Sequence, residues 1–125
     1  MSKSYPPLDQ TPYPRDPRSR EAVLGLPDGN YVFVQDEQGV IHVLPDRPHT
    51  HPRVLGTARS AKYAGDLRIE DGTISDVTNL SGTFQCDDPE GLREVARALR
   101  SLGFVVRPGA VRFFPQDGSR PRVLE

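Results

Sequence analysis

Apolar β-branched and aromatic residues fill two short runs near the start of the chain, 31–35 and 40–44. Between them lie four polar or glycine residues, 36–39, and Gly39 can supply the left-handed conformation that such a loop needs. The pattern predicts a β-hairpin with a four-residue loop.

A second pair of runs, 63–70 and 73–79, is separated only by Asp71-Gly72, a strong signal for a tight hairpin turn. Ile74 and Val77 are three positions apart instead of two, which predicts a bulge or bend. The residues expected to form the buried face are Leu67, Ile69, Ile74 and Val77.

One amphipathic helix is predicted over residues 88–102. Asp88 is a suitable N-cap, Pro89 suits the first helical position, and Gly103 can end the helix. Apolar residues recur at three- and four-residue spacing, giving a single stripe. The stripe consists of Leu92, Val95, Ala96, Leu99 and Leu102.

Two further runs, 104–107 and 110–115, flank Pro108-Gly109, which suits a type II turn. They predict a third hairpin. The expected fold class is therefore α+β, a mostly antiparallel sheet of hairpins with the one helix packed on one face.

Proline content divides the chain into segments. Five of the 13 prolines lie within the first 17 residues, so 1–20 is predicted to be a proline-rich flexible arm. Tyr5 and Tyr13 are candidates to dock this arm onto the domain or a partner, the alternative being an unstructured leader. Residues 21–116 are expected to form a single domain, with 46–53 as a loop and 117–125 as a polar tail that frays.

Composition narrows the class of protein. A net charge of −1 argues against binding nucleic acid by bulk electrostatics, and no apolar run is long enough to span a bilayer. The single cysteine, Cys86, cannot form an internal disulfide, and the N-terminus lacks a secretory apolar region. We therefore expect a cytoplasmic protein.

Candidate chemistry is sparse. His42, His49 and His51 lie close together in sequence, but no further metal-ligand pattern accompanies them, so we expect solvated loop histidines and no metal. Cys86 precedes the helix, where a dipole could lower its pKa, yet a small buried residue is the simpler interpretation. Acidic pairs fall at predicted turns and at the helix cap. We expect no cofactor, and a binding protein in preference to an enzyme.

Basic residues form a stripe on the predicted helix at Arg93, Arg97 and Arg100. Such a stripe is typical of a helix face that is simply exposed to solvent. The alternative interpretation is that the stripe binds phosphate or an acidic partner. The other basic residues that could join it are Arg59, Lys62, Arg107 and Arg112.

Residues 31–107 carry a series of short motifs: Tyr63-Ala-Gly-Asp-Leu67, the Asp71-Gly72 turn and Ser81-Gly-Thr-Phe84 before a helix. This series resembles a β-rich module of bacterial polymorphic-toxin and effector proteins and of plant IQ-motif proteins. The chain departs from that pattern at Thr83-Phe84, which replace His-Tyr, and at Pro52-Arg53, which replace serines. It also has no IQ motif. The resemblance implies an α+β fold and, with those polar groups lost, a binding role.

We accordingly expect a small protein-interaction module, part of a bacterial toxin, effector or immunity system. A homodimer formed by sheet extension is a further expected mode of association. The alternative is a small enzyme or ligand-binding domain that uses a corner formed by His51, Asp66 and Cys86. The residues predicted to bind the partner are His51, Arg53, Tyr63, Gly65, Asp66, Ser81, Gly82, Thr83 and Phe84.

Overall fold

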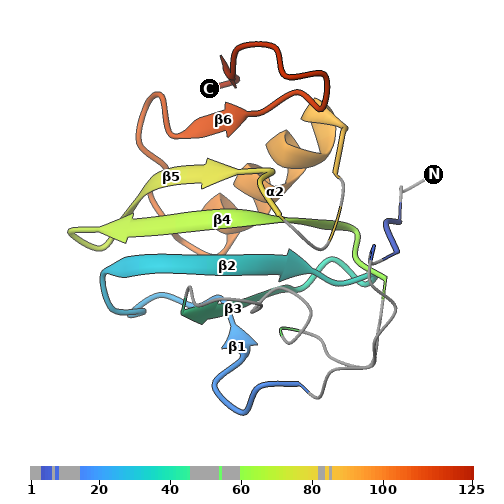
Figure 1. The fold of residues 1–125 in the computed structure, drawn as a ribbon. Coiled ribbons are helices and arrows are strands. Elements are labelled where there is room, and N and C mark those ends of the chain that lie inside the picture. Colours follow the sequence, from blue (N-terminus) through green and yellow to red (C-terminus); the bar gives the residue numbers. More distant parts are fainter. Residues whose placement is uncertain are drawn as a thin grey trace.

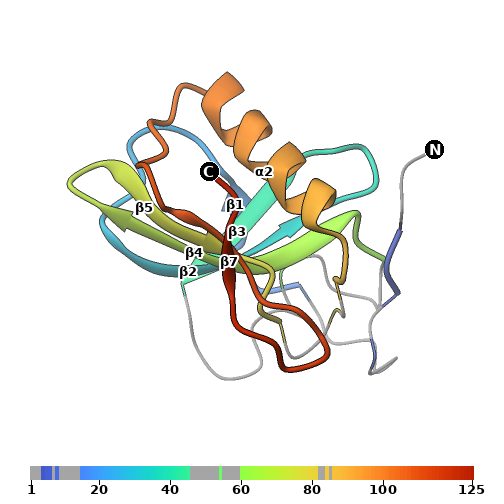
Figure 2. The ribbon, with the colours of Figure 1, turned by 90° about the horizontal axis from the view of Figure 1, so that it is seen from above.

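A computed structural model describes residues 4–6, 8, 15–45, 54, 60–81, 84 and 86–125. These residues form one mixed sheet in the order β1-β3-β2-β4-β5-β6-β7, with one helix, α2, on one of its faces (Figures 1 and 2). The strands are β1 (Arg20–Glu21), β2 (Gly29–Gln35), β3 (Ile41–Pro45), β4 (Tyr63–Glu70), β5 (Thr73–Thr78), β6 (Val111–Phe113) and β7 (Arg122–Val123). The helix is α2 (Pro89–Ser101). The predicted fold class is confirmed.

The first predicted hairpin is confirmed as β2 and β3, which pair antiparallel. In its loop Gly39 has a φ of 91°. The Asp36 carboxylate closes the loop by accepting hydrogen bonds from the amides of Gln38 and Val40, each at 3.0 Å. Its second oxygen lies 2.8 Å from Nε2 of His42, so this histidine has a partner within the hairpin.

The second predicted hairpin is confirmed as β4 and β5. Both turn residues are left-handed, Asp71 with φ 52° and Gly72 with φ 73°, as a type I′ turn requires. The Asp28 carboxylate holds the turn by accepting hydrogen bonds from both turn amides, at 2.8 and 3.0 Å. The register shifts where Ile69 pairs with Ile74, which confirms the predicted bulge.

The helix begins and ends as the sequence predicts. Asp88 caps it by accepting a hydrogen bond from the Glu90 amide at 3.1 Å, and Gly103 follows its end with a φ of 101°. Its apolar stripe faces the sheet and is buried (Figure 2). The exception is Leu102, predicted to belong to the stripe, which is 45% exposed because it lies at the C-cap, beyond the last packed turn. The buried stripe consists of Leu92, Val95, Ala96 and Leu99.

The third predicted hairpin is wrong. The type II turn exists: Gly109 has a φ of 78°, and the Ala110 amide donates to the Arg107 carbonyl at 3.1 Å. The flanking segments do not pair across it, however. Both run parallel to β5, with Val106 bridging Ile74 and Val111 pairing with Val77. Helix α2 makes the crossover that brings the chain back in the same direction, as a parallel pair requires.

The predicted fraying of the tail is also wrong for its last residues. Strand β7 pairs antiparallel with β6. The Leu124 amide donates to the Val111 carbonyl at 2.8 Å, and the Gly109 amide donates to the Glu125 carbonyl at 2.9 Å. Within the predicted arm, Tyr5 bridges Ala61, and Arg20 is already part of β1. The domain boundaries themselves stay a prediction.

Candidate functional site

The predicted partner-binding corner is only partly described by the structure. His51, Arg53, Gly82 and Thr83 lie outside the described residues. The other predicted residues, Tyr63, Gly65, Asp66, Ser81 and Phe84, can be placed.

Tyr63 is a core residue and not a surface contact, which corrects the prediction. Its side chain is 1% exposed, and its hydroxyl donates to the Asp88 carbonyl at 2.9 Å. The ring packs against the helix backbone at Gly91, where an added Cβ would lie 2.5 Å from a ring carbon. Burial raises the pKa of Tyr63, so the phenol stays protonated. An alanine here would open the core instead of removing a contact with a partner.

Gly65 permits a close approach of backbone, but the backbone that approaches it belongs to the same chain. A Cβ on Gly65 would lie 1.7 Å from the carbonyl oxygen of Thr78, which crosses over it. The space that the prediction reserved for a partner's backbone is therefore filled by the end of β5. Gly65 is a structural requirement of the β4–β5 pairing.

The remaining corner residues also have structural roles. The Oγ of Ser81 accepts a hydrogen bond from the Phe84 amide at 3.1 Å, and the Phe84 side chain is 2% exposed. Asp66 is half-buried, and its amide donates to Oγ1 of Thr78 at 3.4 Å. The burial of Tyr63 and Phe84 removes the two aromatic contacts that the prediction offered to a partner.

The alternative corner of His51, Asp66 and Cys86 gains no support as a reactive site. Cys86 is fully buried, and its carbonyl accepts a hydrogen bond from Nδ2 of Asn79 at 2.9 Å. Burial raises the pKa of the Cys86 thiol to about 12. The predicted dipole effect at the helix start is therefore outweighed by desolvation, and the thiolate needed of a nucleophile is disfavoured.

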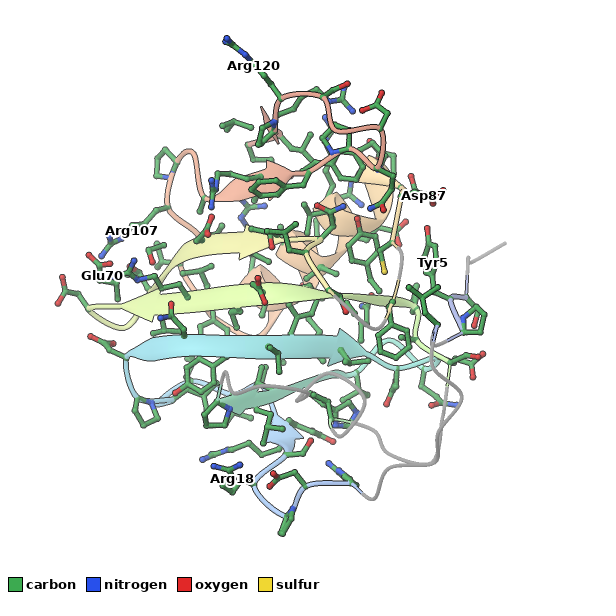
Figure 3. The ribbon with its side chains drawn as sticks, in the orientation of Figure 1. Tyr5, Arg18, Glu70, Asp87, Arg107 and Arg120 are labelled. Atoms are coloured by element: carbon green, nitrogen blue, oxygen red, sulfur yellow. The ribbon has the colours of Figure 1, made fainter. Side chains whose placement is uncertain are left out.

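Carboxylates partner most of the basic residues proposed for phosphate binding. Arg112 makes two hydrogen bonds of 2.7 Å to Asp76, and Arg100 lies 2.6 Å from Glu125. Arg107 lies 3.6 Å from Glu70, its neighbour in Figure 3. Arg93 pairs with Glu90, and Lys62 lies 3.9 Å from Glu94. This pairing leaves little net positive potential, so the arrangement favours the solvated-face interpretation.

An apolar groove that the sequence analysis missed lies between the C-terminal end of α2 and the β1–β3 edge of the sheet. Its volume is about 410 Å³. Val40 and Leu102 line it and remain 36% and 45% exposed, while Leu24, packed near Gly103, is 57% exposed. The lining residues are Glu21, Ala22, Gly39, Val40, Ile41, Ala98, Ser101 and Leu102. The only hint in the sequence was an apolar residue at the helix C-cap and another directly after the hairpin glycine.

Within the described part of the chain, no three His, Cys, Asp or Glu side chains gather as a metal site would require. No helix among these residues is long and apolar enough to cross a membrane. Comparison with known proteins found no matching family model, no matching curated protein and no matching solved structure.

Proposed function

We propose that this chain is a small protein-interaction module that binds its partner through the groove between α2 and the β1–β3 edge. The observation that carries this proposal is an apolar cavity of about 410 Å³ open to solvent, with large aliphatic side chains exposed at its rim. Exposed apolar surface next to a pocket is a common mark of protein-binding sites. A role within a bacterial toxin, effector or immunity system is the finer proposal, and it is supported only by the motif resemblance.

The chemistry of the groove favours one kind of occupant. Its walls are aliphatic and small: Ala22, Ile41 and Ala98 form them beside Val40 and Leu102. Glu21 is the charged residue among those that line it. A partner that inserts one bulky apolar side chain, with a cationic group beside it, would satisfy both features.

The test compares partner capture by the wild type and by the double variant Val40→Lys, Leu102→Lys. Both side chains are over a third exposed, and lysine at the helix C-terminus is favourable to the helix dipole, so the fold should persist. We expect the affinity for a captured protein to fall at least about tenfold.

Leu80→Lys is the matched control, since Leu80 is 42% exposed and does not line the groove. A protein bound by the wild type and by this control, but not by the groove variant, supports the proposal. Equal binding by all three folded proteins would exclude the groove. A variant at Tyr63, which the sequence predicted as a partner contact, is not a suitable test, because removal of this buried side chain disturbs the core.

A further inference from the structure

A second pocket, of about 220 Å³, lies on the same β1–β3 edge of the sheet as the groove. Arg20 of β1 and Val43 of β3, which pair in register, both line it. The groove uses Ala22, directly after β1, and Ile41 of β3, and the two sites share no lining residue. The residues that line the second pocket are Arg18, Arg20, Leu26, Pro27, Tyr31, Val43 and Pro45, and Arg18 is labelled in Figure 3 beside β1.

The inner surface of this pocket is apolar. Leu26, Tyr31 and Val43 are all buried residues of the core. The Tyr31 hydroxyl already donates to the Pro27 carbonyl at 2.5 Å, so it has no proton left to donate to a ligand. A volume of about 220 Å³ lies below the roughly 300–1,000 Å³ of pockets that hold drug-sized ligands. The pocket therefore suits a single branched aliphatic or aromatic group.

Both charged residues that line the pocket are cations. Arg18 is paired with Asp16, whose carboxylate accepts hydrogen bonds from its Nε and Nη2 at 3.1 and 2.9 Å. Arg20 differs, because no carboxylate in the described part of the chain pairs with it. Burial raises the pKa of the Tyr31 phenol, and the nearby charge of Arg20 opposes this rise. An unpaired guanidinium thus lies beside an apolar pocket.

We propose that this pocket binds an apolar carboxylate: a branched aliphatic or aromatic group fills the pocket, and the attached carboxylate pairs with Arg20. The planar guanidinium can donate two parallel hydrogen bonds to a carboxylate. A phosphate, with up to two charges and three acceptor oxygens, is matched less well by one unpaired arginine. The site is additional to the groove and does not depend on the function proposed for it.

Two sources supply this chemistry, a free small acid and the C-terminal residue of a polypeptide. The test titrates the full-length protein with isocaproate, as the free acid, and with the peptide acetyl-Gly-Gly-Leu, as the polypeptide end. Isocaproamide is the control that keeps the hydrocarbon without the charge, and acetate keeps the charge without the hydrocarbon. The readout is the NMR shift of the Tyr31 and Val43 amides.

We expect a saturable shift with at least one of the two apolar carboxylates, at a dissociation constant of the order of millimolar for ligands of this size. Isocaproamide and acetate should bind more weakly. Arg20→Gln should weaken carboxylate binding about five- to tenfold, through the loss of a hydrogen bond between charged groups at an exposed position. Arg97→Gln is the matched control, since Arg97 is an exposed arginine of α2 that does not line the pocket. It should bind as the wild type does.

The outcomes separate the two sources as well as the proposal itself. Stronger binding of the peptide would assign the pocket to a protein C-terminus, and equal or stronger binding of isocaproate would assign it to a free small acid. Three results would overturn the proposal: no saturable shift with either carboxylate, equal binding of isocaproate and acetate, or equal binding by the wild type and a folded Arg20→Gln variant.

Discussion

At the scale of single residues, burial determines the protonation state of two side chains, Cys86 and Tyr63. The thiol of Cys86 lies fully inside the core, where the charged thiolate loses its hydration. Its pKa is raised to about 12 from an ordinary value of 9.0. The Tyr63 phenol is also buried, and its pKa is raised as well. Both groups therefore act as neutral packing residues, and folding becomes less favourable once alkaline conditions ionise them in the unfolded chain.

The free energy of unfolding should fall as pH rises from about 9 towards 12. Over that range the unfolded chain releases the Cys86 proton while the folded chain retains it. In Cys86→Ala, the fall should be shallower by up to about 1.4 kcal/mol per pH unit. Urea unfolding between pH 8 and 10 measures this difference. Identical slopes in the two proteins, or rapid reaction of Cys86 with a thiol reagent at pH 8, would contradict it.

At the scale of elements, β4 packs against α2 where the large Tyr63 side chain of the strand faces Gly91 of the helix, which has no side chain. The Tyr63 ring lies where a side chain on Gly91 would otherwise project. The ring is fixed there by its hydrogen bond to the Asp88 carbonyl and by its edge contact with Tyr5. Helix propensity disfavours glycine within a helix, and this packing explains why Gly91 stands in the first turn of α2.

The effect of Gly91→Ala should change sign with the residue at position 63. In the wild type we expect a loss of about 1–3 kcal/mol, because the new methyl group overlaps the ring. In the Tyr63→Val background the same change should stabilise by up to about 1 kcal/mol, the ordinary gain in helix propensity. A double-mutant cycle from urea unfolding gives both values. Additive effects would show that the ring and Gly91 do not interact.

At the scale of the whole molecule, the C-terminal strand completes the sheet. Strand β7 pairs with β6, and the backbone of residues 124–125 forms hydrogen bonds with Val111 and with Gly109 in the turn. The Glu125 carboxylate also lies 2.6 Å from Arg100 on α2. The last residues therefore tie the sheet, the type II turn and the helix together.

Deletion of residues 121–125 should lower the free energy of unfolding by about 1–3 kcal/mol, through the lost backbone hydrogen bonds. The Gly109 amide, which bonds to Glu125, should also exchange its hydrogen faster. Glu125→Gln is the control: it removes only a partly exposed ion pair, so its effect should stay below about 1 kcal/mol. An unchanged unfolding midpoint on deletion would mean that the tail frays in solution.

Local patterns in the sequence were enough to predict the two hairpins, the bulge, the helix and its caps. Asp71-Gly72, Gly39 and Asp88 each act on neighbours within a few residues, so their conformational preferences are visible without the fold. The type II turn at Pro108-Gly109 was predicted for the same reason. The two segments beside that turn pair with β5, a choice that depends on where α2 delivers the chain.

The candidate sites depended on the tertiary structure. The motif series of 63–84 placed Tyr63 at a binding corner, whereas its packing under α2 makes it a core residue. The groove beside Val40 and Leu102 exists only because the helix end and the β2–β3 hairpin meet. Tyr5 was a candidate to dock the arm, but its partners Ala61 and Asp87 are more than fifty residues away in sequence. Local sequence determined the elements of this protein, because propensities and turns act between neighbours. Burial and docking surfaces were decided by contacts between distant segments, which only the folded chain brings together.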